Sequence, residues 1–406
     1  MILRRGYVYR LELNAAQRSL CARTAGCTRA VSNHLLAEQF KRLARGEWVQ
    51  RYETMSARLT ELKRSPYMAF LNEVPAQALQ QSLRDLDRAF QDAFDPEQPG
   101  KRMPVFKKKG KARDSFRLPQ GFRFDAARRH RQIFLPKLGW VRFRKRRPWE
   151  GTVKNVTVYR EGRHWFMSLQ TERTVEVPEP LPGIVAGDLG VIDFLALSDG
   201  RRIPSLNAFK RHAERLAILQ RRLARKVRFS SNWKKLNRAI ARLHQRIANL
   251  RRDFIHKLAH GLAKTHGTVI LEDLRVKAMT ASAAGSVENP GQRVARKSGL
   301  NRSILDQGWG LFATVLGYKL AERGGQLILV DARNSSRECP KCHHVGPENR
   351  PTRERFCCVA CGWEKNADLN AALNLLERGL LLLGWSPERI DQWMRDALTP
   401  GHGECA

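Results

Sequence analysis

Alternating apolar and polar positions begin the chain and then give way to a helical period. Residues 7–13 alternate in the manner of a strand with one buried face. Asn14 then occupies an N-cap position, with Gln17 three residues later in a capping-box arrangement. Residues 15–98 are predicted to form several helices, because apolar residues recur at three- and four-residue spacing, as in 78–90.

The pattern changes in residues 99–178, where a β-rich module is predicted. Gly and Pro punctuate short alternations of apolar and basic residues there, and the window 101–150 holds 18 Lys and Arg against 3 acidic residues. Aromatic residues are interleaved with the cations: Phe106, Phe116, Phe122, Phe124, Trp140 and Phe143. Such a mixture suits phosphate contact and base stacking, although a half-buried sheet with a basic outer face would place most of these rings in a core. The expected nucleic-acid contacts are Lys107, Lys108, Lys109, Arg144, Lys145 and Arg146.

Two short apolar runs that end at an acid follow in the second half. Residues 184–188 end at Asp188, and residues 268–272 end at Glu272, as expected for buried strands. Between them a helical hairpin is predicted, broken near 229–232, with apolar residues on one face and Arg and Lys on the other. The remaining expectations are a flexible linker or mobile loop at 280–300, a helix at 304–322 and a strand at 326–330.

The net charge of the chain indicates which kind of molecule the protein binds. The chain carries 74 Lys and Arg against 39 Asp and Glu, a formal net charge of +35. Nucleic acid is favoured over a membrane surface, because the cations run through the whole chain instead of one tail or one amphipathic helix. The sequence contains no run of about 18 apolar residues and no signal-peptide core, so we expect a cytoplasmic protein.

Paired cysteines predict a zinc site. Two C-x-x-C pairs are separated by 15 residues, and their members are Cys339, Cys342, Cys358 and Cys361. In a reducing compartment such pairs indicate a tetrahedral four-thiolate zinc ribbon. Four sulfur ligands leave no open coordination position, so the expected role of Zn²⁺ is structural. Cys357 could replace its neighbour Cys358 as a ligand, and His343 and His344 are weaker candidates.

Three acids stand in contexts that suit a hydrolytic centre. Asp188 and Glu272 end short apolar runs, and Asp368 begins a helix of small residues that can pack closely on a sheet. Phosphodiester hydrolysis needs charge compensation at the scissile phosphate, which two divalent ions about 4 Å apart supply. Carboxylate oxygens suit Mg²⁺ or Mn²⁺. Any one of these acids could instead be a surface carboxylate or a helix cap.

These residues resemble those of the TnpB proteins, transposon-encoded RNA-guided nucleases related to type V CRISPR effectors. The match covers nearly the whole chain, and its specific part is the C-terminal half. The segments that carry it are Gly187-Asp188-Leu189-Gly190, Leu271-Glu272-Asp273-Leu274, Gln307-Gly308-Trp309-Gly310-Leu311-Phe312, Ser335-Ser336-Arg337-Glu338-Cys339, and Cys358-Val359-Ala360-Cys361-Gly362 leading to Asp368. Looser matches lie at Gly26-Cys27-Thr28-Arg29 and Phe106-Lys107-Lys108-Lys109-Gly110.

The resemblance implies an α+β multidomain architecture. A β-barrel wedge domain would be built from 1–13 and 99–178, interrupted by a helical recognition domain at 14–98. An RNase H-like, RuvC-type nuclease domain would comprise 179–332, with 206–263 as its helical hairpin insert, and 363–383. The inserted zinc ribbon would span 333–362, followed by a C-terminal tail at 384–406.

The resemblance also implies an activity. The protein would be an RNA-guided DNA endonuclease of a transposable element, with a guide RNA from the transposon end. It would be nucleoid-associated in a bacterium or archaeon. It would cleave double-stranded target DNA beside a short adjacent motif, with Asp188, Glu272 and Asp368 as catalytic acids holding Mg²⁺ or Mn²⁺. Gln80 would lie in the helix that meets this motif. Arg337-Glu338 departs from the less charged pair expected before the first cysteine, so local substrate contacts are expected to differ.

Two further classes of function compete with this hypothesis. A nuclease-inactive RNA-guided DNA-binding repressor is disfavoured because all three acids are present. A transposase that rejoins DNA through a covalent intermediate needs a Tyr or Ser nucleophile, and none of the six tyrosines stands in a context that indicates one. The sequence leaves open whether one copy of the chain acts or two.

Overall fold

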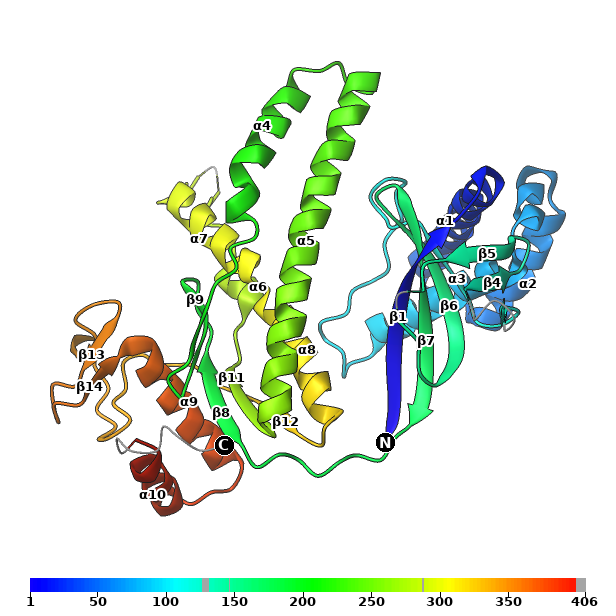
Figure 1. Ribbon diagram of the computed structural model, residues 1–406. Helices are drawn as coiled ribbons and strands as arrows, with labels where there is room; N and C mark the ends of the chain where they lie inside the picture. The colour runs from blue at the N-terminus through cyan, green and yellow to red at the C-terminus, as the bar shows by residue number, and fades with distance from the viewer. Residues whose placement is uncertain (126–130, 146, 287, 399–406) are drawn as a thin grey trace. The chain divides into compact units, whose positions relative to one another are not determined.

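Two compact units, residues 1–176 and 177–406, make up the computed structural model (Figure 1). The structure describes residues 1–125, 131–145, 147–286 and 288–398. Both units combine helices with a sheet, so the α+β class expected from the sequence is confirmed.

A seven-stranded antiparallel sheet organises the first unit, in the order β2-β6-β7-β1-β5-β4-β3. Strand β1 joins its two parts, because residues 2–10 pair with β7 while residues 11 and 12 pair with β5. The closure of this sheet into a β-barrel stays a prediction. The strands are β1 (Ile2–Glu12), β2 (Ser115–Leu118), β3 (Arg123–Phe124), β4 (Gln132–Leu135), β5 (Gly139–Phe143), β6 (Thr152–Glu161) and β7 (His164–Thr174).

The helices of the first unit follow β1 directly: α1 (Ala15–Ala44), α2 (Tyr52–Arg64), the 3₁₀ helix η1 (Pro66–Glu73) and α3 (Ala76–Phe94). The predicted capping box is present, because Asn14 Oδ1 accepts from Gln17 N at 2.8 Å and Gln17 Oε1 accepts from Asn14 N at 3.1 Å. Helix α1 buries Cys21 in the core under the sheet and Leu35 in a second core shared with α2 and α3.

A five-stranded sheet forms the centre of the second unit, in the order β10-β9-β8-β11-β12. Strands β8, β11 and β12 are parallel, whereas β9 and β10 run antiparallel to their neighbours. Both strands predicted to end at an acid are therefore present and adjacent. The strands are β8 (Ile184–Asp188), β9 (Asp193–Leu197), β10 (Arg202–Pro204), β11 (Thr268–Glu272) and β12 (Gln326–Val330).

Helices cover both faces of this sheet. On β11, Val269 and Leu271 point into a core that also contains residues of α5 (Ser231–Thr265) and α8 (Trp309–Ala321), while Ile270 points into a core with α9 (Ala367–Leu382). The apolar runs of the strands are thus explained by burial on both faces. The short elements that remain are η2 (Lys210–His212), α6 (Val276–Met279), η3 (Pro347–Asn349), β13 (Arg355–Cys357) and β14 (Glu364–Asn366).

The predicted helical hairpin is formed by α4 (Ala213–Ala224) and α5, which run side by side in Figure 1. Its turn covers residues 225–230, slightly before the break expected at 229–232. Leu216 of α4 packs with Ile240, Leu243 and Ile247 of α5, which are the apolar face that the sequence predicted.

Two expectations for the second unit were wrong. The expected helix at 304–322 is two helices, α7 (Val294–Gln307) and α8, separated by Gly308, whose φ of 78° interrupts the helical path. The expected linker at 280–300 is also shorter, because α7 begins within it and is held by Asn301 Nδ2, which donates to Thr280 O at 2.9 Å.

The C-terminal segment contains a further helix, α10 (Pro387–Leu398), whose Ile390 is buried beside α9.

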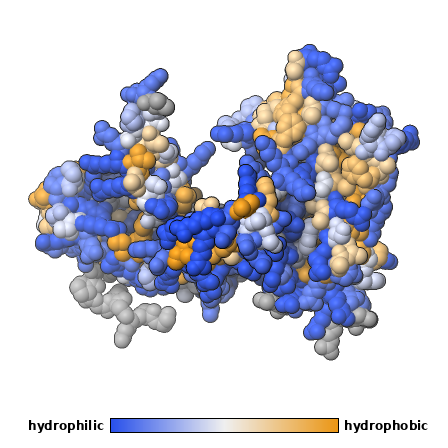
Figure 2. All heavy atoms as spheres, turned by 90° about the horizontal axis from the view of Figure 1, so that it is seen from above, coloured by the Kyte–Doolittle hydropathy of each residue, from blue (hydrophilic) through white to orange (hydrophobic). Residues whose placement is uncertain are grey.

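Hydrophilic residues dominate the face shown in Figure 2, with smaller hydrophobic patches between them. In the part of the chain that the structure describes, every helix is too short or too polar to cross a membrane.

Close packing of α9 on β11 gives a testable expectation for stability. A Cβ at Gly379 would lie 2.4 Å from Cδ1 of the buried Ile270, so Gly379→Ala should lower the free energy of unfolding by about 1–3 kcal/mol. Gly261→Ala is the matched control, because no heavy atom lies within 4 Å of its added Cβ on the exposed side of α5. That substitution should be neutral or stabilise by about 0.5–1 kcal/mol. Denaturant unfolding of both variants measures the difference, and equal stabilities would contradict this packing.

Candidate active site and zinc-binding cluster

Two acids meet where adjacent parallel strands end. Leu271 of β11 pairs with Gly187 of β8, so Glu272 and Asp188 stand next to each other at the carboxyl edge of the sheet. Glu272 Oε1 accepts a hydrogen bond from Leu189 N at 2.8 Å, which fixes the orientation of its carboxylate. Both side chains are half-buried. The register therefore brings together residues that are far apart in the chain.

Burial and mutual proximity change the pKa values of Asp188 and Glu272. Burial raises the pKa of Asp188 well above its ordinary value, and the neighbouring charges of Glu272 and Asp368 raise it further. Burial also raises the pKa of Glu272, but the hydrogen bonds from Asp188 and from Leu189 N oppose that shift. Of the two acids, Asp188 therefore has the stronger tendency to retain a proton.

Asp368 comes to the same place on α9. Asn366 caps this helix, and its Oδ1 accepts from Asp368 N at 3.0 Å and Leu369 N at 3.3 Å. Leu373 and Leu376 bury α9 against the sheet, in the core that contains Ala186 of β8 and Ile270 of β11. The side chain of Asp368 is 32% exposed, and it is close enough to Asp188 to raise the pKa of that acid.

Two arginines that the sequence did not single out lie beside Asp368. Arg350 Nη2 lies 3.7 Å from Asp368 Oδ1, and Arg202 Nη2 lies 3.8 Å from Asp368 Oδ2. Arg202 is held by Asp193, whose Oδ2 accepts from Arg202 Nε at 2.6 Å. Arg350 also lowers the pKa of Asp188. No pattern in the sequence marks either residue, because their proximity to the acids depends on tertiary structure alone.

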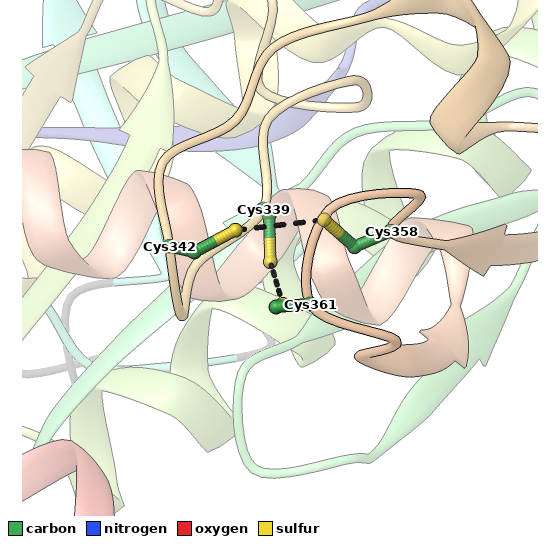
Figure 3. A group of neighbouring side chains, drawn as sticks. All are labelled: Cys339, Cys342, Cys358 and Cys361. Atoms are coloured by element: carbon green, nitrogen blue, oxygen red, sulfur yellow. Dashed lines mark hydrogen bonds between the residues drawn. The ribbon is translucent and has the colours of Figure 1, made fainter.

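The four cysteines of the C-x-x-C pairs converge on one point (Figure 3). Their sulfur atoms all lie within 4.8 Å of one another, with Cys339 Sγ 3.6 Å from Cys361 Sγ and Cys342 Sγ 3.5 Å from Cys358 Sγ. A tetrahedron with Zn–S bonds of about 2.3 Å has S···S edges of about 3.8 Å. The cluster therefore fits Zn²⁺ with little adjustment. Among the described residues, Asp188, Glu272 and Asp368 do not form a group of three that meets this distance criterion.

Cys357 stands apart from this cluster. It lies on β13, and the group of converging ligand atoms contains Cys358 and not Cys357. The two histidines that follow the first pair have acidic neighbours instead: His343 lies 3.7 Å from both Glu338 and Glu377, and His344 lies 3.8 Å from Glu348. The geometry therefore favours the four predicted cysteines as the metal-binding set.

Buried asparagines fasten the cysteine cluster to α9. Asn370 and Asn374 are one helical turn apart, and the Nδ2 atom of each donates to Glu338 O, at 2.8 Å and 2.7 Å respectively. Asn374 Nδ2 also donates to Ser335 O at 2.7 Å. Glu338 itself forms an ion pair with Arg378 of the same helix. Helix α9 thus holds the peptide before Cys339 and carries Asp368 at its own beginning.

The predicted nucleic-acid contacts that the structure describes lie in the first unit. Lys107, Lys108, Lys109 and the helical residue Gln80 are exposed. Arg144 is exposed and donates from Nε to Glu12 Oε1 at 2.7 Å, and Lys145 Nζ lies 4.6 Å from the centroid of the Trp149 ring. A pocket of about 510 Å³ is lined by Glu12, Arg131, Gln132, Arg142, Phe143, Arg144 and Lys145. Arg146 lies outside the described residues.

The interleaved aromatic residues divide between core and surface. Phe116 and Phe143 are buried, as the sheet interpretation expects, and Phe122 and Phe124 pack partly against the same core. Phe106 and Trp140 are 46% and 48% exposed. Only the last two present large ring surfaces to solvent among the six.

Known families match most of these segments. The family "Probable transposase" matches residues 168–283, which include Asp188 and Glu272, and "Cas12f1-like, TNB domain" matches residues 309–375, which include the cysteine cluster and Asp368. A third family, "Helix-turn-helix domain", matches residues 1–47, which here form β1 and α1.

Relatives that match almost the whole chain show to which family the protein belongs. The chain is 42% identical to "Putative RNA-guided DNA endonuclease InsQ" of Escherichia coli (strain K12), over 93% of this chain and 92% of that protein. It is 33% identical to "Putative RNA-guided DNA endonuclease" of Streptomyces pristinaespiralis, over 93% of this chain and 90% of that one. The chain belongs to the TnpB family. The family resemblance stated from the motifs is confirmed.

A solved structure shares the fold of this TnpB protein. The structure titled "Cryo-EM structure of the Cas12f1-sgRNA-target DNA complex" aligns with a TM-score of 0.53 and 14% sequence identity, over 92% of this chain and 99% of that one. A shorter match, 41% identical over 58 residues, is to the CRISPR-associated endodeoxyribonuclease Cas12f1 of Sulfoacidibacillus thermotolerans.

The raised pKa of Asp188 predicts how pH acts on the metal-free TnpB protein. Because folding raises this pKa, the native state keeps a proton in the pH range just above about pH 4, where the unfolded chain releases it. The contribution of this group to stability is therefore full at low pH and is lost as the pH rises through the native pKa. Asp188→Asn should remove this loss. In the presence of a chelator, the melting temperature of the variant minus that of the native protein should therefore increase with pH. A pH-independent difference between the two proteins would contradict the raised pKa of Asp188.

Adjacent cysteines provide a sharp test of the zinc ligands. Cys358→Ser should reduce bound zinc from one ion per chain to near zero and lower the melting temperature, because ligation contributes to folding. Cys357→Ser should keep the full zinc content. Elemental analysis of both purified variants measures the outcome. Loss of zinc in the Cys357 variant alone would instead make Cys357 the ligand.

Proposed function

We propose that this protein is an RNA-guided DNA endonuclease that cuts its target by phosphodiester hydrolysis. The observation that carries the proposal is the pairing of Asp188 with Glu272 at the ends of two parallel strands, with Asp368 close by. Relatives that cover almost the whole chain have names that include this activity. In this proposal the five-stranded sheet and its helices are a RuvC-type, RNase H-like nuclease domain.

The three carboxylates suit divalent cations. Asp188, Glu272 and Asp368 are hard oxygen donors, and burial together with the neighbouring carboxylates raises the pKa of Asp188, which a bound cation would oppose. Mg²⁺ or Mn²⁺ would be held by these acids and, when bound, would neutralise charge at the scissile phosphate and activate a water. Leu189 N keeps Glu272 oriented, and Arg202 and Arg350 lie beside Asp368 and offset part of its charge.

Guide RNA and double-stranded target DNA are the proposed partners. The net charge of +35 suits a large polyanion, and the solved structure that shares this fold is titled as a complex with sgRNA and target DNA. Base pairing with the guide would then read most of the sequence, while the protein holds the backbone and reads a short adjacent motif. The first unit would supply the wedge and recognition domains, including Gln80 and the exposed lysines 107–109.

The cysteine cluster is proposed to hold a structural Zn²⁺. All four ligand positions are filled by sulfur, which leaves no place for a substrate or water. Since Asn370 and Asn374 join the peptide before Cys339 to α9, the ion would stabilise the loop that carries Arg350 towards Asp368.

Cleavage assays with substituted acids test the proposal. The protein is co-expressed with the transcript that flanks its gene, and the complex receives Mg²⁺ and plasmids with a target beside randomised bases. Asp188→Ala, Glu272→Ala and Asp368→Ala should each lower the cleavage rate at least about a thousandfold, because several kcal/mol of charge stabilisation is lost. Asp253→Asn is the control, because this exposed acid of α5 pairs only with Lys257 among the described residues.

The result expected for the native protein is guide-dependent double-strand cleavage. Guide-dependent binding without cleavage would overturn the nuclease proposal in favour of an RNA-guided repressor. Cleavage that persists in all three acid variants would place the catalytic centre elsewhere.

A further inference from the structure

The turn of the α4–α5 hairpin exposes apolar side chains at its tip. Val227 is 80% exposed and Phe229 is 62% exposed. The Phe229 ring has Trp233 on one side, with ring centroids 5.5 Å apart, and Arg228 with its Cζ 5.0 Å from the ring centroid. These neighbours orient the ring without covering it, so most of its surface stays available for a partner.

The backbone at Phe229 is unusual for such a residue. Its φ of 68° lies in the left-handed region, which strongly favours glycine and disfavours bulky side chains. Asn, Asp or Gly at this position would form the turn with less strain. Burial of the ring does not compensate for the strain, because the ring is mostly exposed. A strained and exposed aromatic residue indicates selection for contact with something outside the chain.

Positive charge surrounds this tip. No acidic residue occurs from Arg215 to Arg252, a stretch that holds 13 Lys and Arg. On α5 four exposed cations follow one another at four-residue spacing: Lys234, Arg238, Arg242 and Arg246. They form a cation stripe that extends about 18 Å from the tip along the helix, with about 6 Å between neighbours. A nucleic-acid duplex carries one phosphate per strand for every 3.4 Å or so of its axis, so phosphates are dense enough for each cation of the stripe to meet a different one.

The base of the hairpin is held firmly. Asp306 at the end of α7 is buried, and its carboxylate accepts from Phe209 N at 2.8 Å and from Arg251 Nη2 at 2.6 Å. Leu216 and Ile240 pack the two helices together beyond this point. From Ser231 at the tip to Arg251 at this base, α5 spans about 30 Å, which corresponds to about 9 base pairs at a spacing of about 3.4 Å. The tip is thus held at the end of a rigid arm.

We propose that the hairpin tip binds the end of the guide RNA–target DNA duplex, with the Phe229 ring stacked on the last base pair. The cation stripe follows the phosphates that lead to this end. The inference rests on the proposed function, and it adds a length requirement: Phe229 makes its contact only when pairing between guide and target extends as far as the tip.

Two different occupants fit the same features less well. A single-stranded nucleic acid is usually bound by several aromatic residues that stack successive bases, whereas this tip offers one open ring. An anionic membrane would meet the tip alone, and it would not use cations that run 18 Å or so along the helix axis.

The test uses targets that match the guide over about 10 to 20 base pairs. Binding to the protein–guide complex is measured in an Asp188→Ala background, so that the DNA stays intact. Phe229→Gly should weaken the Kd about tenfold for long matches and leave short matches unchanged, because stacking is lost only where the duplex reaches the tip. Phe229→Trp should retain the affinity. Trp48→Ala, which removes a ring that is 83% exposed in the first unit, is the control for loss of an exposed aromatic residue.

Stability and salt dependence separate this contact from a structural role. Phe229→Gly relieves the left-handed strain, so its melting temperature should equal or exceed that of the native protein. Lys234→Gln and Arg238→Gln should each reduce the slope of log Kd against log salt by about one for long matches.

Each result has a distinct meaning. Equal weakening at all match lengths, or at none, would overturn the proposal while leaving guided binding intact. Binding of the free protein to phosphatidylserine vesicles that is lost in Phe229→Gly, without an effect on DNA, would assign the tip to a membrane instead. Absence of guide-dependent binding in the native complex would overturn the proposed function together with this inference.

Discussion

The parallel pairing of β8 with β11 is the interaction on which the candidate site depends. It places two carboxylates from distant parts of the chain at one edge of a sheet that is buried on both faces. Burial makes their mutual repulsion costly, and burial and repulsion together raise the pKa of Asp188. Every other feature of the site either completes this negative cluster or limits its charge. Asp368 adds a third carboxylate, while Arg202 and Arg350 lie beside it and offset part of its charge.

Helix α9 connects the acids to the cysteine cluster. Its first turn carries Asp368, and the buried side-chain amides of Asn370 and Asn374 hold the peptide before Cys339. Farther along the helix, Gly379 allows close contact with Ile270 of β11. A shift of this helix would therefore move the third acid and the cysteine-bearing loop together. Through this helix, the hydrogen bonds of Asn370 and Asn374 link the position of the cysteine-bearing loop to that of Asp368.

Local patterns in the sequence predicted the elements of the site, but tertiary packing determined how they meet. The apolar runs that end at Asp188 and Glu272 are strands because β-branched and aliphatic residues are buried on both faces, and their signal is therefore visible in sequence. The two C-x-x-C pairs can likewise be recognised from short-range spacing alone, so the cysteine cluster was predictable from the sequence. Arg202 and Arg350 could not be found in this way, since an exposed arginine and an arginine near an acid look the same in sequence. The break at Gly308 was missed for a related reason: its added Cβ would lie 3.0 Å from Arg251 of α5, a contact between segments far apart in the chain.

The chain as a whole is positively charged, whereas the cluster of acids is negatively charged. This difference affects the order in which nucleic acid and divalent cations reach the acids. The chain as a whole is strongly positive, which attracts nucleic acid over long distances. The site itself is a negative cluster that repels a phosphate unless cations are present. A nucleic-acid phosphate can therefore approach the acids closely only when divalent cations neutralise them, and each bound phosphate in turn strengthens the binding of those cations. By thermodynamic linkage the two affinities must increase by the same factor. Under the proposed function, the protein would therefore bind a guide and its target through remote cations without metal, whereas the final approach of the scissile phosphate to Asp188, Glu272 and Asp368 would depend on it.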